Sequence, residues 1–309
     1  MKYFFTKYKF FLSGAALILT AASCTSTLSD EPATDARAIS FTPAAETRAA
    51  VEGGTLPADF LVWGGYSNTL LFEGETVHPN GSYENGTRYW VPGTYNFYAV
   101  YPATIKDKTT FSNGSLTVKD FDCSATGNAA VDLMTAIPPS IPYEAGNEPQ
   151  PVAMEFQHEL ARVNVTIKTE ESTATAVSAK MWGIGYQGNF SKSNGKAQWE
   201  TLVQAAEGNT PFTRTAEATI DKLGIPLLNE MLLPPQNITD TQGATIYVSY
   251  RYTGDNTVKE KRVPLPAITW AAGKSYTYTL TIEPDGRIHF DPPTINEWGE
   301  AQGGIIIVA

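Results

Sequence analysis

Apolar and polar residues alternate along several stretches of the chain. In residues 94–101, large or apolar side chains at every second position fall on one face of an extended segment. The same period of two recurs in residues 163–168, 246–252 and 276–282. A strand with one dry face and one wet face is typical of antiparallel sheets packed over a core. The pattern therefore predicts an all-β protein.

Turn residues separate these stretches. Asn-Gly pairs supply the positive φ angles that tight hairpins need, and they stand at residues 80–81, 85–86, 113–114 and 194–195. No long amphipathic helix is predicted. Residues 222–233 contain Leu and Ile, but Pro226 interrupts them, so this segment is expected to form at most one short helical turn.

The proline-rich residues 138–151 indicate an edge or a connection, because proline cannot donate to a sheet ladder. The length of the chain on each side of this stretch suits one sandwich domain. We therefore expect two antiparallel β-sandwich domains in tandem, at residues 49–151 and 152–309.

The first residues have the layout of a secretory signal. Three lysines without an acidic residue precede the apolar residues 10–22, a run shorter than the ~20 residues that a membrane-spanning helix needs. Small residues then lead to Cys24, as in a bacterial lipoprotein signal. We predict a signal peptide at residues 1–23 and lipidation of Cys24. The alternative is an ordinary signal peptide with a chance cysteine near its cleavage site.

Two further features limit the class of protein: the segment that follows the signal peptide, and the net charge. Residues 25–37 are small and polar, which is typical of a flexible tether. Loss of the three signal lysines changes the formal charge from −10 to −13, and such an acidic surface disfavours nucleic acid as a partner. With Cys24 acylated, Cys123 has no partner, so we exclude a disulfide framework and expect Cys123 to be a small buried residue.

Five phrases stand in a recognisable order along the chain. They are Arg88–Pro102 (RYWVPGTYNFYAVYP), Val152–Ile167 (VAMEFQHELARVNVTI), Met231–Gln236 (MLLPPQ), Trp270–Ile282 (WAAGKSYTYTLTI) and Ile295–Ala309 with Trp298. Together with the lipoprotein-like start, this order resembles the fimbrillin family, the subunits and accessory proteins of type V pili in Bacteroidales. The resemblance implies transthyretin-like β-sandwich domains and a structural or adhesive pilus subunit. Stalk, tip and anchor roles all fit the sequence.

The resemblance also implies export as an outer-membrane lipoprotein, followed by cleavage by an arginine-specific protease after the first strand. The matching cut lies between Arg48 and Ala49, with Arg37 and Ala38 as a second candidate. A cut after Arg48 would discard residues 24–48, which hold the lipid, the tether and the first strand. This change takes the charge from −13 to −11, because the segment has four acidic and two basic residues. The mature form would then lie on the cell surface in fimbriae.

Loss of the first strand, expected at residues 39–42, would leave unpaired N–H and C=O groups beside an apolar groove. A strand from a neighbouring subunit can satisfy both. The candidate donor strand is residues 304–309 (GIIIVA), an uncharged run whose β-branched members are Ile305, Ile306, Ile307 and Val308. The alternative is that this run is the last core strand of its own domain. The expected partners are other pilus subunits in a homo- or hetero-polymer, the outer membrane before processing, and a host or bacterial surface receptor.

No residue pattern indicates catalysis, so we expect no enzyme, no metal site and no cofactor. His158 is isolated in an alternating stretch, which favours a structural hydrogen bond, and His78 and His289 lack the spacing of metal ligands. Two acidic pairs are attributed to solvated faces: Asp120 with Asp122, and Glu155 with Glu159.

A second hypothesis is an anchored surface lipoprotein that binds glycan. The aromatic residues between positions 63 and 101 could stack on sugars, although their alternating positions favour packing in the core. The two hypotheses differ at the N-terminus of the mature protein. A start at Ala49 favours the pilus subunit, and an acylated Cys24 favours the anchored binder.

Overall fold

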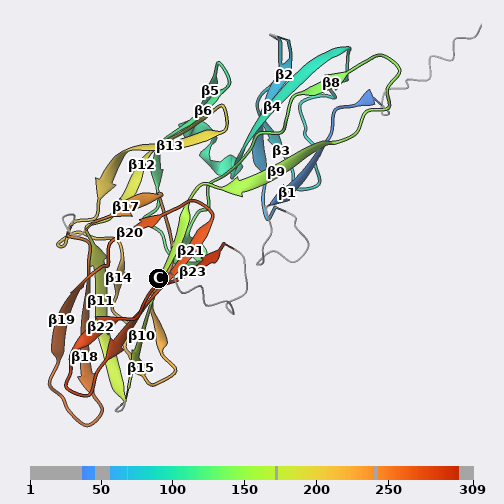
Figure 1. Ribbon diagram of the computed structural model, residues 1–309. Helices are drawn as coiled ribbons and strands as arrows, with labels where there is room; N and C mark the ends of the chain where they lie inside the picture. The colour runs from blue at the N-terminus through green and yellow to red at the C-terminus, as the bar shows by residue number, and fades with distance from the viewer. Residues whose placement is uncertain (1–36, 46–55, 68, 171–172, 240–242, 299–309) are drawn as a thin grey trace, which may run out of the picture.

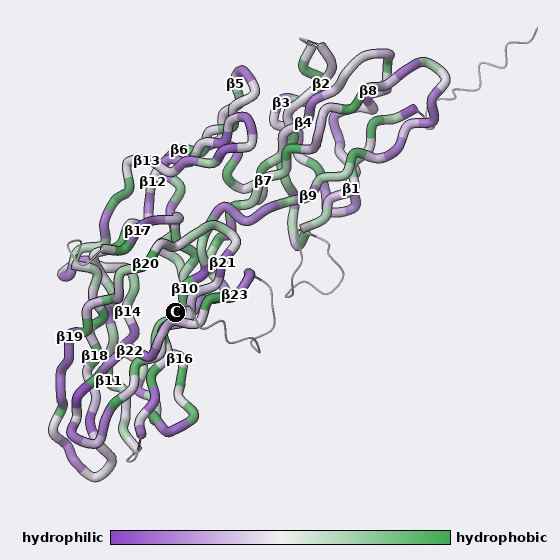
Figure 2. The backbone as a smooth tube through the Cα atoms, in the orientation of Figure 1, coloured by the Kyte–Doolittle hydropathy of each residue, from purple (hydrophilic) through white to green (hydrophobic). Residues whose placement is uncertain are grey.

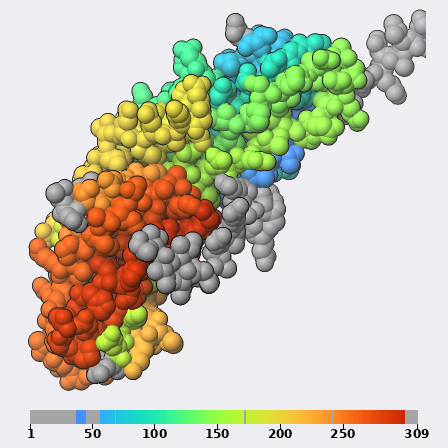
Figure 3. Space-filling model, viewed as in Figure 1, coloured from blue at the N-terminus to red at the C-terminus, as the bar shows by residue number. Residues whose placement is uncertain are grey.

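The computed structural model describes residues 37–45, 56–67, 69–170, 173–239 and 243–298, and their regular structure is almost entirely β-strand. The strands form an elongated molecule, with a seven-stranded sheet at one end and two five-stranded sheets at the other (Figure 1). The space-filling view in Figure 3 shows the same separation of early and late strands. No helix within the described ranges is long and apolar enough to cross a membrane. The predicted all-β class is confirmed.

The seven-stranded sheet has the order β1-β9-β7-β4-β2-β3, and β8 pairs with β4 next to β7. Its strands are β1 (Phe41–Ala45), β2 (Phe60–Tyr66), β3 (Thr69–Val77), β4 (Gly93–Tyr101), β7 (Met134–Ala136), β8 (Ile141–Tyr143) and β9 (Val152–His158). The sheet folds over its own core, because the ring of Phe41 on the β1 edge lies 5.2 Å from the ring of Phe72 on the β3 edge. It therefore forms both layers of a small sandwich.

A four-stranded sheet joins the two ends of the molecule in the order β13-β12-β6-β5. Its strands are β5 (Thr109–Ser112), β6 (Ser115–Asp122), β12 (Gly185–Ser193) and β13 (Lys196–Gln204). Two short 3₁₀ helices precede β5 and β7: η2 (Ala103–Lys108) and η3 (Gly127–Ala129). The hairpin turns at Asn113-Gly114 and Asn194-Gly195 have positive φ at both residues, as predicted from the Asn-Gly pairs.

Two five-stranded sheets form the sandwich at the other end, in the orders β16-β10-β21-β22 with β23 on β21, and β14-β11-β18-β19 with β15 on β11. The first contains β10 (Ala161–Thr169), β16 (Ile225–Leu233), β21 (Lys274–Ile282), β22 (Ile288–Phe290) and β23 (Thr294–Glu297). The second contains β11 (Ala174–Trp182), β14 (Thr213–Arg214), β15 (Ala218–Ile220), β18 (Thr245–Tyr252) and β19 (Lys259–Pro264). A short ribbon adds β17 (Gln236–Ile238) and β20 (Ile268–Trp270).

Most predicted strands are present, and the exceptions have physical causes. The alternating stretches correspond to β4, β10, β18 and β21. The expectation of at most one short helical turn in residues 222–233 is met, but the sequence pattern did not predict β16, which occupies most of them. Pro226 is tolerated there since β10 is the only described strand that pairs with β16, and the one other bridge, from Thr126 to Met231, lies away from Pro226. Two strand pairings among the described residues are parallel, β1 with β9 and β10 with β21, and both join strands far apart in sequence.

Two separate hydrophobic clusters fill the molecule. One lies inside the folded-over seven-stranded sheet, and the other extends from the outer face of β2 through the four-stranded sheet to the far sandwich. Strand β2 separates them, since Phe60 and Val62 face the first cluster while Leu61 and Trp63 face the second. Figure 2 shows polar residues concentrated on outer strands such as β19. The larger cluster therefore runs from β2 through the four-stranded sheet into the far sandwich, and the smaller one is confined to the seven-stranded sheet.

Sheet pairing bears on the predicted domain boundary. Strand β9 pairs with β1 and β7 in the seven-stranded sheet. The strand that starts at the predicted boundary therefore belongs to the seven-stranded sheet, while the four-stranded sheet pairs β6, before the boundary, with β12, after it. The division into two tandem domains itself stays a prediction.

A buried ion pair lies where the chain leaves the seven-stranded sheet. Lys192 of β12 is 6% exposed and Glu159 is 3% exposed, and their Nζ and Oε1 atoms are 2.5 Å apart. The hydroxyl of Thr135 in β7 donates to the same carboxylate at 2.5 Å. The attribution of Glu159 to a solvated face is therefore wrong, although Glu155 is exposed as expected. No local pattern indicates a partner 33 residues away.

We predict that Lys192→Met lowers the free energy of unfolding by about 3–5 kcal/mol, because the Glu159 carboxylate is left buried without its counter-ion. Denaturant unfolding measures the effect. The double variant Lys192→Met/Glu159→Leu should regain most of the loss. Arg287→Met is the control, since the side chain of Arg287 is 73% exposed in its ion pairs and should cost no more than about 1 kcal/mol. Equal costs for Lys192→Met and Arg287→Met would contradict the prediction.

Candidate functional site

Strand β1 lies where the two edges of the folded seven-stranded sheet come together. All five residues of β1 pair in parallel with β9. Just before β1, the N–H of Ile39 donates to the carbonyl of Arg88 at 2.8 Å. The N–H of Trp90 donates to the carbonyl of Arg37 at 3.0 Å. The segment formed by residues 37–45, called here the β1 segment, is therefore bonded on both sides.

Two apolar side chains anchor the β1 segment in the core. Ile39 is 1% exposed and Phe41 is 3% exposed. The ring of Phe41 lies edge-on to the rings of Phe72, Phe97 and Tyr83, with centroids 5.2, 5.6 and 6.1 Å away. Each such contact contributes about 0.5–1.5 kcal/mol beyond the burial of area. Removing the segment would leave an apolar groove, the β1 groove, beside the unpaired backbone of β9.

Arg88 and Tyr83 hold the β1 segment from the other side. The Arg88 guanidinium donates to the carboxylate of Glu75 at 2.7 Å and lies over the rings of Phe72 and Tyr83, at 4.8 and 5.1 Å. The hydroxyl of Tyr83 donates to the carbonyl of Ile39 at 2.9 Å. Burial raises the pKa of the Tyr83 phenol, so it remains a neutral donor. Sequence reasoning missed both residues, although Arg88 begins one of the five phrases.

The candidate processing residues lie at the two ends of the β1 segment. Arg37 is exposed, but its carbonyl is hydrogen-bonded and Ala38 forms a bridge with Tyr89. Arg48 and Ala49 lie outside the described residues, as do the lipidation site Cys24 and the donor residues, Ile305, Ile306, Ile307 and Val308. Their roles stay predictions.

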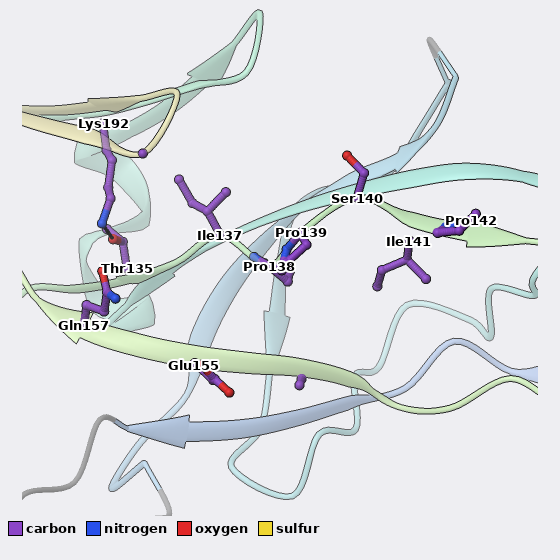
Figure 4. Close-up of a pocket in the computed structure, with 12 residues that line it drawn as sticks. Thr135, Ile137, Pro138, Pro139, Ser140, Ile141, Pro142, Glu155, Gln157 and Lys192 are labelled. Carbon is purple, nitrogen blue, oxygen red and sulfur yellow. Dashed lines mark hydrogen bonds between the residues drawn. The ribbon is translucent and has the colours of Figure 1, made fainter.

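A pocket of about 600 Å³ lies along the other edge of β9, and it is called here the β9 pocket (Figure 4). Thr135, Gln157 and Lys192 lie at one end of it, and residues 137–142 form one wall. Strand β7 pairs with only the last two residues of β9, and β8 pairs with β4 but not with β9. The pocket therefore fills a gap between strands within the sheet.

The other candidate residues have structural contacts. The Nδ1 atom of His158 lies 2.6 Å from a carboxylate oxygen of Asp132, and its ring stacks on Trp298 at 4.1 Å. This confirms the predicted structural role of His158. Cys123 is buried as predicted, and burial raises the pKa of its thiol, so it is a poor nucleophile at neutral pH. The described part of the chain contains no group of His, Cys, Asp and Glu that could hold a metal ion.

The aromatic residues considered for sugar binding lie mostly in the core. Trp63, Trp90, Tyr95 and Phe97 are buried. Tyr89 is exposed at 38%, but it stands in the bridge with Ala38. The interpretation of these residues as packing residues is confirmed for the four buried rings.

The fold and the β1 segment define an all-β protein of sandwich type, closed by a short strand at its N-terminal end. The family model described as fimbrillin-like matches residues 47–298. The chain therefore belongs to the fimbrillin-like family. None of the curated proteins matches it significantly.

Solved structures share the fold over most of the chain. A candidate cell adhesion protein of Bacteroides uniformis is 19% identical with a TM-score of 0.52, and the match covers 85% of this chain and 98% of that one. A candidate cell adhesion protein of Bacteroides ovatus is 15% identical with a TM-score of 0.54, at the same coverages. A fimbrial protein of Bacteroides vulgatus is 14% identical with a TM-score of 0.50, covering 85% and 99%.

We predict that Phe41→Ala lowers the free energy of unfolding of the uncleaved protein by about 3–5 kcal/mol, because it leaves a cavity among three aromatic rings. Thr42→Ala is the matched control, since Thr42 is exposed on the same strand and should change stability by less than about 0.5 kcal/mol. Chemical denaturation compares the two variants. Similar small effects for both would show that β1 does not anchor the first core.

Proposed function

We propose that this protein is a structural or adhesive subunit of a type V pilus, exported as a lipoprotein and assembled by strand exchange after arginine-specific processing. Membership of the fimbrillin-like family supports the pilus or adhesion role. The observation that carries the assembly mechanism is the β1 segment, a short edge element that inserts Ile39 and Phe41 into a closed core. Its removal would expose backbone groups and apolar side chains together, which is what an incoming strand can satisfy.

Covalent attachment explains why a cut is needed. While β1 remains linked to the body of the protein, it competes for its groove at a high effective concentration, and a strand from another molecule competes poorly. Cleavage between β1 and β2 removes this advantage. The exchanged strand can then win by burial at the positions after Phe41, where its Ile and Val side chains bury more apolar area than the Thr, Pro and Ala residues of β1.

The direction of the chain favours Arg48 over Arg37 as the cleavage site. The β1 segment connects to the rest of the protein through its C-terminal end, so only a cut after residue 45 can release it. A cut after Arg37 would leave Ile39 and Phe41 attached. The backbone at Arg37 and Ala38 is also hydrogen-bonded, whereas proteases prefer segments free of such bonds.

We predict that Arg48→Ala remains full-length, lipid-bound and unpolymerised when it is expressed in cells with the arginine-specific protease. Arg37→Ala should be processed like the unchanged protein and start at Ala49. N-terminal sequencing of the mature form and the SDS-resistant ladder on gels measure both outcomes. Normal assembly of Arg48→Ala would rule out this processing step, and an acylated Cys24 on the unchanged mature protein would favour the anchored glycan binder.

We predict that Ile306→Asp gives a processed subunit that forms no ladder, because a charge in the donor strand cannot enter an apolar groove. Leu223→Asp is the control, since Leu223 is 94% exposed on a far loop and should leave the ladder unchanged. The readout is the ladder formed after processing by purified arginine-specific protease. A normal ladder from Ile306→Asp would show that residues 304–309 are not the donor.

A further inference from the structure

Strand β9 has a second edge, which β7 occupies only at Gln157 and His158 and which no described strand occupies from Val152 to Phe156. The N–H of Val152 donates to the carbonyl of Ser40, on the side of β1, at 2.8 Å. Successive N–H groups of a strand point to opposite sides, so those of Ala153 and Glu155 point away from β1, toward the β9 pocket. Within the described part of the chain, no strand pairs with these two residues on that side and no loop carbonyl accepts from them.

The opposite wall of the β9 pocket has a different chemistry. Residues 137–142 have the sequence IPPSIP, so most of this wall is apolar and its three prolines have no N–H to donate. One wall therefore offers backbone hydrogen bonds and the other offers apolar contact. An extended, apolar, β-branched segment fits this combination, because it can pair with β9 while its side chains contact the prolines and isoleucines.

The C-terminal end of the chain starts close to this pocket. The ring of Trp298 stacks on His158, the last residue of β9, with centroids 4.1 Å apart. The preceding residue, Gln157, lines the β9 pocket. At least eleven residues follow Trp298 in the sequence. Fully extended, they reach about 36 Å at ~3.3 Å per residue, while the open part of β9 from Ala153 to Gln157 spans only about 13 Å.

We propose that, in the unassembled subunit, the β9 pocket holds the chain's own residues 304–309 as an added strand beside β9. The role of this segment as the later donor rests on the function proposed above; its binding in the pocket does not. Gly303 and Gly304 allow the chain to turn before the apolar run begins.

Binding in the β9 pocket would shield residues 304–309 from aggregation. Four consecutive β-branched residues without charge or proline are prone to pair with other chains when they are exposed. Pairing with β9 satisfies their backbone within the same molecule. Their release would then be a step that precedes donation to a neighbour, and the pocket would set how readily a subunit polymerises.

Amide hydrogen exchange tests this proposal on the uncleaved chain of residues 25–309 and on the same chain ending at Gly303. We expect the amides of Ala153 and Glu155 to exchange at least about tenfold faster in the truncated chain. The amides of Met154 and Phe156 are the matched internal control, because they face β1 and should not change. Equal exchange of Ala153 and Glu155 in the two chains would overturn the proposal.

A disulfide test identifies which molecule supplies the segment. Oxidation of the variant Glu155→Cys/Ile306→Cys should give a cross-linked monomer, while the control Leu223→Cys/Ile306→Cys should give none. A cross-linked dimer without a cross-linked monomer would overturn the proposal, since the segment would then come from a second copy. The functional proposal fails separately: a processed chain ending at Gly303 that still forms the ladder would exclude the donor role and leave the exchange result unaffected.

Discussion

The structure of the N-terminal half depends on one contact, the insertion of Phe41 between the two edges of a single folded-over sheet. The strand that carries it is short and lies at an edge, yet it supplies both a ladder to β9 and a ring that touches β3, β4 and the Tyr83 loop. Backbone pairing and core filling are therefore coupled in one segment. Losing either would mean losing both, and this coupling is the physical basis of the proposed exchange.

Strand β9 connects this contact to the rest of the molecule. One of its edges is paired with β1, and most of the other faces a pocket. Its C-terminal end is secured by the Lys192–Glu159 pair and by the stack of His158 on Trp298. The strand is thus held at its C-terminal end by side-chain contacts and, over Val152–Phe156, by strand pairing with β1 alone. Changes at the β1 edge and changes at the pocket act on the same five residues, Val152–Phe156.

Local signals in the sequence predicted much of the fold. Alternation located β4, β10, β18 and β21, and the Asn-Gly pairs located two hairpin turns, because both signals act over a few neighbouring residues. The failures concern distant partners. The burial of Glu159 depends on Lys192, the strand at Ile225–Leu233 depends on β10, and the role of Arg88 depends on Glu75 and the β1 segment. Of the site, the sequence indicated that a strand begins near Ile39. It gave no sign of the gap beside β9, which arises from how β7 and β8 divide the edge of β4.

The parallel pairing of β1 with β9 gives the vacated groove a direction. A replacement strand that keeps this register must enter with its own chain running the same way, so each subunit would join the next in one orientation only. A filament built in this manner has a direction, and its two ends differ. One end has an unfilled β1 groove, and the other has a donor strand that is not inserted into a neighbour. Elongation and capping would then occur at different ends, and a subunit lacking either feature would terminate growth on one side alone.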